Sequence, residues 1–183
     1  MRVVGGTKKG KRLASVVHDK TRPTSDRVRE AIFNVLGQTL PAANVLDVCA
    51  GTGAMGLEAI SRGAAKAVFI DSASEAFEII KENAAGLGFT AMARVIKEDA
   101  VKAVRKLGKE GLKFQLVFVD APYADVELTK NVLAELKTSG VLDEALIVCE
   151  VAKRSVEDVD TPGYVVETEK TYGDTVVLFL REN

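Results

Sequence analysis

Three glycines follow a short apolar run at the spacing of a nucleotide-binding loop. Gly51, Gly53 and Gly56 form a G-x-G-x-x-G pattern directly after the run that ends at Cys49. Glycine allows the backbone to approach a ligand closely and to adopt positive φ angles. Such a loop between a strand and a helix binds dinucleotides, so the spacing alone indicates a ligand without identifying it. A strand-to-helix turn without a ligand is the alternative.

The residue type at position 47 separates the possible ligands. Asp47 lies at the end of the strand that precedes the loop, where a carboxylate would repel the pyrophosphate of a dinucleotide. S-adenosylmethionine has no phosphate, and its ammonium and sulfonium are cations that a carboxylate attracts. Asp47 therefore favours this methyl donor, although the same side chain can also cap the loop by accepting hydrogen bonds from backbone amides.

Two further acids follow the next two predicted strands and suit an adenosine ligand. Asp71 comes 20 residues after Gly51 and can accept hydrogen bonds from both ribose hydroxyls. Asp99 can accept a hydrogen bond from the adenine amine, or it can begin a helix as its N-cap. The predicted donor site comprises Asp47, Ala50, Gly51, Thr52, Gly53, Gly56, Asp71, Ser72, Asp99 and Ala100.

A second reactive group follows the apolar run 116–119. An exocyclic amine is a poor nucleophile because its lone pair is delocalised, and Asp120 with the carbonyl of Ala121 can accept its two hydrogens and direct the lone pair at a methyl carbon. Tyr123 can stack on a base that is flipped out of its helix, and Pro122 makes the turn rigid. The predicted catalytic residues are Asp120, Ala121, Pro122 and Tyr123. The alternative is an Asp-x-Pro turn that ends a buried strand.

The elements that position these groups alternate between strands and helices. Strand-like apolar runs cover 45–49, 67–70, 94–96, 116–119 and 146–149, and helical patterns cover 54–62, 73–85, 99–107 and 125–138. Continuous apolar strands separated by helices predict a parallel sheet covered on both faces. Runs at 164–169 and 175–180 around a turn predict a terminal hairpin with one antiparallel strand. The expected fold is α/β, a doubly wound, seven-stranded, mostly parallel Rossmann-like sheet in the order of class I methyltransferases.

Positive charge is concentrated at the N-terminus. Residues 1–30 hold 9 of the 25 basic and 3 of the 26 acidic side chains, so the remaining chain has 16 basic and 23 acidic ones. Residues 1–23 are expected to form a basic arm with a hairpin, and residues 24–183 the donor-binding domain. A first helix is expected to begin at Thr24 as its N-cap and to end before Gly37. A basic arm on an acidic body indicates a polyanionic partner, although a solvated terminus is the alternative.

Several classes of protein are excluded by composition. No apolar run reaches the roughly 18 residues that span a bilayer, and no apolar segment follows the basic N-terminus as in a secretory signal. Cys49 and Cys149 are isolated thiols in apolar stretches, as expected in a reducing compartment. One His and no C-x-x-C motif give little basis for a metal site. We therefore expect a cytoplasmic protein without a metal or membrane partner, and nothing requires more than a monomer.

Together these motifs resemble the RsmD-type methyltransferases over nearly the whole chain. The resemblance rests on RVVGG (2–6) with KGKRL (9–13), TRPTSDRVREAIFN (21–34), LDVCAGTGAMGLEA (46–59) and YGDT (172–175). It implies methyl transfer from S-adenosylmethionine to the exocyclic N2 of a guanine in small-subunit (16S) ribosomal RNA, as naked RNA or in the assembled subunit. It makes the candidate RNA contacts Arg2, Lys8, Lys9, Lys11, Arg12, Arg22, Arg27 and Arg29. A solvated helix face is the alternative for Arg27 and Arg29.

Three departures from the family pattern and three rival functions stay open. Ala121 replaces the first Pro of the (D/N)PP(Y/F) motif, Cys49 replaces the usual Phe, and Asp71 replaces the usual Glu. A methyltransferase could act on another amino nitrogen, such as adenine N6 or a protein glutamine, but Asp120 and the basic arm favour a nucleic acid. Asp47 argues against a nicotinamide-dependent oxidoreductase. Ala121 leaves open a non-catalytic RNA-binding relative.

Overall fold

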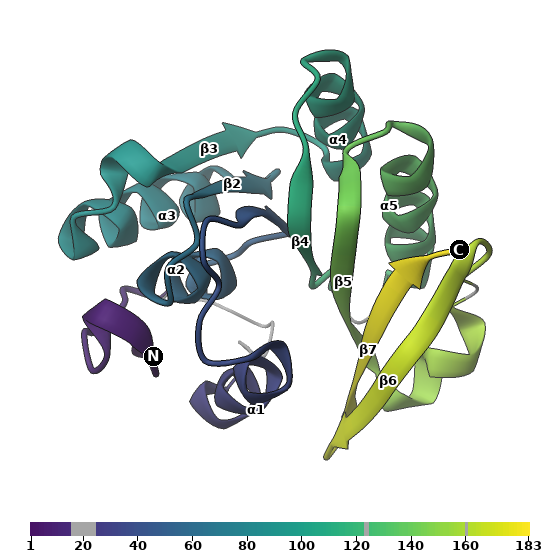
Figure 1. Ribbon diagram of the computed structural model, residues 1–183, viewed down its shortest axis with the longest axis horizontal. Coiled ribbons are helices and arrows are strands. Elements are labelled where there is room, and N and C mark those ends of the chain that lie inside the picture. The colour runs from purple at the N-terminus through teal and green to yellow at the C-terminus, as the bar shows by residue number, and fades with distance from the viewer. Residues whose placement is uncertain (16–24, 123–124, 160) are drawn as a thin grey trace.

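A central sheet runs through the structure, a computed structural model that describes residues 1–15, 25–122, 125–159 and 161–183. Its strands are β1 Asn44–Val48, β2 Lys66–Asp71, β3 Ala93–Lys97, β4 Phe114–Val119, β5 Leu142–Ala152, β6 Tyr164–Tyr172 and β7 Thr175–Glu182. They form one seven-stranded sheet in the order β3-β2-β1-β4-β5-β7-β6 (Figure 1). The first five strands pair in parallel, and β7 pairs antiparallel with both β5 and β6. The predicted mostly parallel sheet with one antiparallel strand is confirmed.

Helices cover both faces of this sheet. They are α1 Asp26–Leu36, α2 Ala54–Ser61, α3 Ser74–Leu87, α4 Ala100–Lys109 and α5 Val126–Thr138, with short 3-10 helices η1 Gly6–Lys8, η2 Thr90–Met92 and η3 Lys153–Asp158. One apolar core joins α4 and α5 to the sheet, and a second joins α1, α2, α3 and the N-terminal residues to the opposite face. None of the described helices is long and apolar enough to cross a membrane.

The strand order changes direction between β1 and β4. From β1 the chain continues through β2 to β3 on one side, and it then returns to form β4 on the other side of β1. These two strands are neighbours, although β2 and β3 come between them in the sequence. In open α/β sheets, ligands bind outside the carboxyl ends of the strands at such a reversal. The loop after β1 carries the glycine pattern, and the loop after β4 carries the Asp120–Tyr123 motif. We call these two loops the first and the second corner, and the topology brings both to one edge of the sheet.

One strand is much longer than its apolar pattern predicts. β5 covers 142–152, whereas the sequence indicates only 146–149. The exposed Asp143 and Glu144 interrupt the apolar pattern near the start of the strand. They lie at an irregularity, where Glu144 has φ 48° and the pairing with β4 shifts register between Phe114 and Leu116. A bulge leaves its extra residues outside the regular ladder, so these two side chains can face solvent.

The start of α1 differs from the expectation. Thr24 lies outside the described residues, and the N-cap is Ser25, whose Oγ accepts a hydrogen bond from the amide of Val28 at 3.2 Å. Asp26 occupies the first turn, where a negative charge interacts favourably with the helix dipole. Adjacent Thr and Ser residues are both good N-caps, so the sequence alone does not distinguish them.

The N-terminal residues form a tight loop with very little strand. In residues 1–15 the pairing consists of an antiparallel bridge between Arg2 and Arg12, in place of the two strands expected for a hairpin. Amide hydrogen bonds from Val3 to the Lys11 carbonyl (2.9 Å) and from Gly10 to the Val3 carbonyl (2.8 Å) close the loop. The expected boundary of this N-terminal arm at residue 23 lies outside the described residues and stays a prediction.

Candidate active site

The glycine loop joins β1 to α2 at the carboxyl edge of the sheet. Gly51 and Gly53 have φ angles of 55° and 74°, which glycine adopts without steric cost. Cys49, directly after β1, has φ 61°, a left-handed conformation that costs a residue with a side chain about 1–3 kcal/mol. The amide of Ala50 donates to the Ile70 carbonyl at 3.0 Å, which fixes the loop against β2. Strain of this kind is concentrated at functional sites.

Asp47 and Gly56 attach the beginning of α2 to the sheet. The side chain of Asp47 is only 1% exposed, and its Oδ2 accepts a hydrogen bond from the Gly56 amide at 2.9 Å. A Cβ at position 56 would lie 2.4 Å from the ring of Phe69, so this contact requires glycine. The pKa of Asp47 is raised to about 7, mainly because the carboxyl is buried; the hydrogen bond from Gly56 lowers this pKa, and the charge of Asp71 raises it. The alternative in which Asp47 caps the loop is therefore realised.

The two acids predicted for adenosine are held by backbone amides. Asp71 ends β2, where Oδ2 accepts from the Gly51 amide and Oδ1 from the Ala73 amide, both at 2.9 Å. Asp99 is the N-cap of α4, and its Oδ1 accepts from the Lys102 amide at 3.0 Å. Both carboxylates are thus oriented at the same edge of the sheet as the glycine loop.

The second corner begins where β4 ends. The amide of Asp120 donates to the Val48 carbonyl at 3.3 Å, so this corner lies directly beside the end of β1. Ala121 is buried and Pro122 is exposed, and the amide of Asp125 closes the turn by donating to the Pro122 carbonyl at 2.8 Å. Tyr123 lies outside the described residues, so its predicted stacking role stays a prediction.

The thiol of Cys49 lies in an acidic environment. The pKa of Cys49 is raised to about 12, first by burial and then by the charges of Asp71, Asp120, Asp47 and Asp125. β1 pairs in parallel with both β2 and β4, so Asp47, Asp71 and Asp120 lie at the carboxyl ends of three adjacent strands. The site therefore suits a cationic ligand. Among the described residues, no group of three or more His, Cys, Asp or Glu is placed to hold a metal ion.

Sequence reasoning missed Glu150, an acid beside the second corner. It is a buried residue near the carboxyl end of β5, one residue beyond the apolar run that marked this strand. A small cavity reaches from the second corner to it and is lined by Ala121, Pro122, Asp125, Val126, Thr129, Glu150, Val151, Ala152, Ser155 and Val159. The signal that could have found it is that the apolar run resumes at Val151 and Ala152, so Glu150 is a single acid inside a longer apolar stretch.

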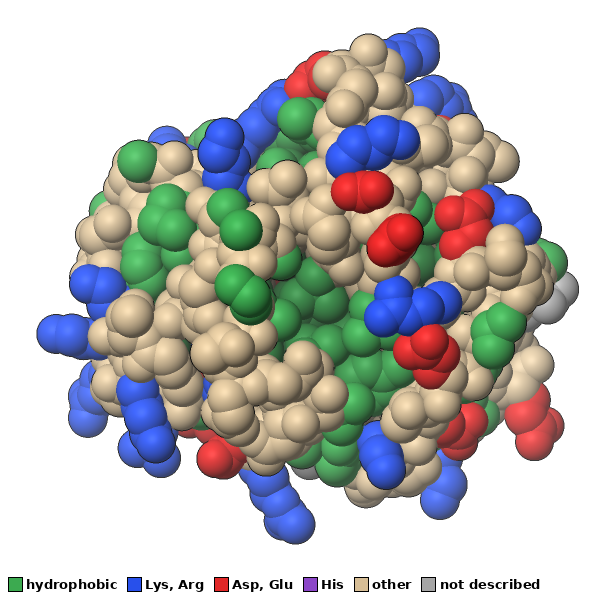
Figure 2. Space-filling model, viewed as in Figure 1, with side chains coloured by type: hydrophobic (Ala, Val, Ile, Leu, Met, Phe, Trp, Pro, Cys, Tyr) green, Lys and Arg blue, Asp and Glu red, His purple; other side chains and the backbone are tan. Residues whose placement is uncertain are grey.

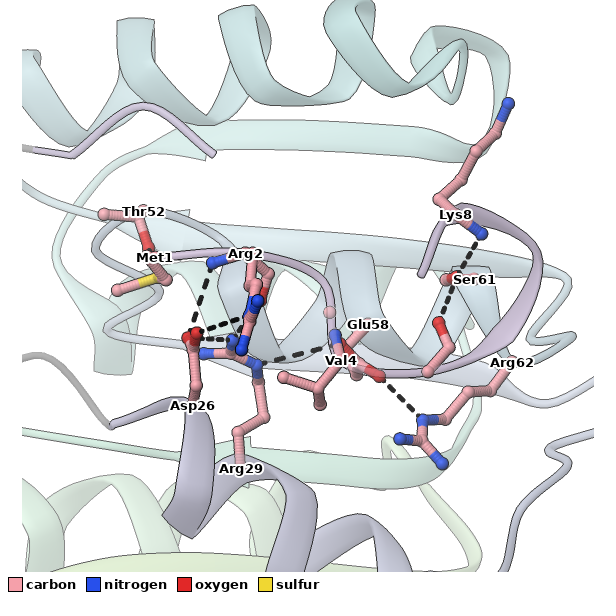
Figure 3. A network of polar contacts seen from close by, with 12 residues as sticks. Met1, Arg2, Val4, Lys8, Asp26, Arg29, Thr52, Glu58, Ser61 and Arg62 are labelled. Carbon is pink, nitrogen blue, oxygen red and sulfur yellow. Dashed lines mark hydrogen bonds and ion pairs between the residues drawn. The ribbon is translucent and has the colours of Figure 1, made fainter. Parts of the chain in front are cut away.

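One candidate RNA contact is wrong. Arg29 is completely buried, so its guanidinium has no surface with which to meet a phosphate. It donates to Asp26 Oδ1 at 2.8 Å and to the carbonyl of Arg2, and its Nε lies 3.7 Å from Glu58 Oε2 (Figure 3). Arg29 therefore anchors the N-terminal arm to α1 and α2.

The other basic candidates differ in exposure. Those exposed are Arg2, Lys9, Lys11, Arg12 and Arg27. Lys8 is half-buried, with its Nζ 5.7 Å from the centre of the Phe89 ring, and Arg22 lies outside the described residues. Figure 2 shows Lys and Arg side chains projecting along the left edge, where Figure 1 places the N-terminal arm.

A buried charge cluster, formed by Glu58, Arg29 and Arg62, attaches the arm to α2. Glu58 is completely buried and accepts from the amide of Val4 and from Nε of Arg62, each at 2.8 Å (Figure 3). The guanidinium of Arg62 also lies 4.7 Å from the centre of the Phe33 ring. The helix that begins at the glycine loop is therefore also the support of the arm.

The buried carboxyl of Asp47 provides a prediction about stability. A pKa near 7 in the folded protein, against 3.8 for an ordinary Asp, corresponds to about 4 kcal/mol. The folded state therefore binds a proton that the unfolded chain has already released, and wild-type stability falls as the pH rises from about 4 to about 7. Asp47→Asn is expected to raise the free energy of unfolding by about 2–4 kcal/mol at pH 8 and by almost nothing at pH 4.

Urea unfolding of both proteins at the two pH values measures this difference. The matched control is Asp174→Asn, since Asp174 is exposed in the turn between β6 and β7, and its change should stay within about 0.5 kcal/mol. A gain that is equal at pH 4 and pH 8 would show that repacking, and not the buried charge, is responsible.

Comparison with known proteins identifies the family. Residues 1–181 match the family model described as "Conserved hypothetical protein 95". YlbH of Bacillus subtilis, named as a candidate rRNA methyltransferase, is 37% identical over 183 residues, covering 100% of this chain and 99% of the relative. "Ribosomal RNA small subunit methyltransferase D" of Escherichia coli K12 is 38% identical over 152 residues, 82% of this chain and 74% of the relative.

A solved structure agrees with these sequence matches. The candidate methyltransferase yhhF of Escherichia coli superposes with a TM-score of 0.85 at 32% identity, over 100% of this chain and 98% of that one. The family model, the sequence relatives and the superposed structure all cover the glycine loop after β1 and the Asp120 turn after β4. The chain therefore belongs to the RsmD-type methyltransferases, the family whose model is described as "Conserved hypothetical protein 95".

Proposed function

We propose that this chain transfers the methyl group of S-adenosylmethionine to the exocyclic N2 of a guanine in 16S ribosomal RNA. The observation that carries the proposal is the proximity of two corners. The glycine loop after β1 and the Asp120 turn after β4 are joined by the hydrogen bond from the Asp120 amide to the Val48 carbonyl. Carboxylates of both corners influence the same thiol. A donor site and an amine-orienting site thus share one edge of the sheet.

The donor-site assignment follows the local chemistry. Asp71 offers a fixed carboxylate to the ribose hydroxyls, and Asp99 offers an acceptor to the adenine amine. A cationic donor beside Asp47 would lower the raised pKa of this carboxyl, so that its charged form attracts the ammonium and sulfonium. A Cβ at Gly51 would meet nothing within 4 Å, so the loop surface there is open to a ligand. The donor supplies an electrophilic methyl carbon when bound. The neighbouring Ala50, Thr52, Gly53, Gly56, Ser72 and Ala100 complete the proposed site.

The acceptor site is proposed at Asp120 and Ala121. The carboxylate of Asp120 and the carbonyl of Ala121 accept the two hydrogens of the guanine amine, which orients its lone pair. Asp120 then takes the proton that the amine releases once it is methylated. Ala121 lacks the rigidity of the usual proline, but its side chain is only 3% exposed and the turn is closed by the bond from Asp125 to Pro122. Packing therefore substitutes for the missing ring.

The ribosomal RNA is proposed to meet the basic edge of the arm. A ribosomal partner places the enzyme in the cytoplasm, where we expect it to act as a monomer. Replacing Lys8, Lys9, Lys11 and Arg12 by Glu should weaken RNA binding strongly at low salt, because each contact with a phosphate releases a counterion. The slope of log Kd against log salt should fall by about 3 if all four side chains contact single-stranded RNA.

A matched set of lysines controls for net charge. Four exposed lysines at the amino edge of the sheet, opposite the loops, are Lys66, Lys109, Lys113 and Lys137. Replacing them by Glu changes the net charge similarly but leaves the arm intact. If both sets reduce affinity and slope equally, RNA is attracted by overall charge and the arm has no specific role.

Methyl transfer tests the proposed function directly. The purified chain is incubated with tritiated S-adenosylmethionine and either naked 16S RNA or small ribosomal subunits, and the labelled nucleoside is identified by chromatography. N2-methylguanosine is the expected product. Label in N6-methyladenosine or in protein glutamine would support the rival acceptors. Absence of label from every RNA offered would contradict the proposal.

A further inference from the structure

One buried amide joins the N-terminal arm to the donor loop. Asn83 on α3 is 5% exposed, and its Oδ1 accepts from the amide of Ala14 at 2.7 Å. Its Nδ2 donates to the Ala14 carbonyl at 3.1 Å and to the Thr52 carbonyl at 3.0 Å. Since a backbone amide only donates and a carbonyl only accepts, the orientation of the Asn83 amide is fixed. The same side chain thus holds two segments that lie far from it in the sequence.

Further contacts connect the arm to the helix that begins at this loop. Thr52 Oγ1 donates to the sulfur of Met1 at 3.4 Å, beside the loop (Figure 3). At the far end of α2, Ser61 Oγ donates to the Gly5 carbonyl at 2.7 Å and accepts from the Lys8 amide at 2.9 Å. The arm therefore follows α2 from the donor loop to the last residue of the helix and returns to Asn83.

This arrangement makes the order of the arm and the geometry of the loop depend on each other. Thr52 stands between Gly51 and Gly53, and both glycines have positive φ angles. Because glycine has no Cβ, the backbone on each side of Thr52 can adopt more conformations than it could beside other residues. The bond from Asn83 to the Thr52 carbonyl limits that freedom, and the two bonds with Ala14 orient the same amide. A ligand that orders the arm thus favours the loop conformation, and by linkage a ligand in the loop favours the ordered arm.

We propose that Asn83 is a positioning residue through which RNA on the arm and the methyl donor in the loop strengthen each other's binding. The proposal rests on the proposed function, because it takes residues 50–56 as the donor site and the arm as the RNA contact. Asn83 is not among the site residues expected from the sequence. It lies on α3, between β2 and β3, and is far in the sequence from both the glycine loop and the Asp120–Tyr123 motif.

The experiment measures binding of S-adenosylhomocysteine, the demethylated donor, by calorimetry with and without a saturating 16S RNA fragment. In the wild type, RNA should tighten this binding about fivefold to tenfold, within the usual range of coupling between sites. Asn83→Ala should weaken binding about tenfold without RNA and should reduce the effect of RNA to less than twofold. Asn83→Asp, which keeps the acceptor for Ala14 but loses both donated bonds, should behave in the same way.

A second variant disturbs the arm without touching the loop. Ser61→Ala removes both hydrogen bonds that the Ser61 side chain makes with the arm, while its carbonyl still accepts from Thr7 Oγ1. This variant should weaken binding of S-adenosylhomocysteine about threefold. In Asn83→Ala the connection between the arm and the loop is already lost, so adding Ser61→Ala should not weaken binding of S-adenosylhomocysteine any further. Tyr164→Phe is the control for stability, because it removes a buried hydrogen bond to the Leu133 carbonyl on α5. Its binding should equal that of the wild type.

The outcomes separate this proposal from the proposed function. If the wild type binds neither S-adenosylhomocysteine nor RNA, the proposed function fails. If the wild type binds both, but RNA tightens binding equally in wild type and Asn83→Ala, the coupling is overturned while the function stands. Should Asn83→Ala unfold, unchanged affinity in Ser61→Ala would overturn the coupling by itself.

Discussion

Asp120→Ala is expected to reduce the rate of methyl transfer at least about a thousandfold while leaving the affinity for S-adenosylhomocysteine within about threefold. Positioning of the amine and acceptance of its proton are both lost, and each is worth orders of magnitude in rate. The donor loop keeps its own contacts, because the bond to the Val48 carbonyl comes from the backbone of residue 120. Single-turnover kinetics and calorimetry on the same preparation measure the two quantities.

Asp120→Asn separates the two roles of this carboxylate. The amide oxygen can still accept a hydrogen from the guanine amine, but it cannot take up a proton. Retention of more than about a tenth of the rate would show that orientation dominates, and a loss equal to that of the alanine variant would show that proton acceptance dominates. Asp158→Ala, at the exposed end of η3, is the control. If Asp120→Ala lost donor affinity and rate together, the residue would belong to the donor pocket.

Glu58→Ala is expected to lower the free energy of unfolding by about 3–5 kcal/mol, because it leaves the guanidinium groups of Arg29 and Arg62 buried without their shared carboxylate. All three side chains are almost completely inaccessible, so water cannot replace the lost partner without opening the structure. The amide of Val4 would lose its acceptor as well. Urea unfolding at pH 7.5 measures the difference.

A surface ion pair supplies the comparison for this cluster. Glu78 and Lys81 lie three residues apart on α3 with 3.4 Å between Oε2 and Nζ, and both are well exposed. Glu78→Ala should cost less than about 1 kcal/mol, since water screens exposed pairs. Equal losses in the two variants would mean that the arm is loose enough for water to reach Glu58 in solution.

The sheet and the two corners could be predicted from the sequence, because apolar runs and glycine spacing are signals that neighbouring residues provide. Asp71 and Asp99 follow their strands as expected, and both are held by neighbouring amides. The burial of Arg29 was not predictable in the same way. Its partner Glu58 lies on another helix, and a basic residue in a charged helix has the same pattern whether it faces solvent or an ion pair. Asn83 gave no local signal either, because its partners Ala14 and Thr52 are distant from it in the sequence.

The position of Cys49 in the loop proposed to bind the methyl donor has a consequence for the reactivity of its thiol. A thiolate near an electrophilic methyl carbon would be alkylated, which would inactivate the protein covalently. With a pKa of about 12, only about one molecule in 10⁵ carries the reactive thiolate at pH 7. Burial is the main reason that this sulfur stays protonated, and the aspartates proposed to attract the cationic donor add to the effect. The proposed site could therefore hold an alkylating agent beside a cysteine without losing the enzyme to self-methylation.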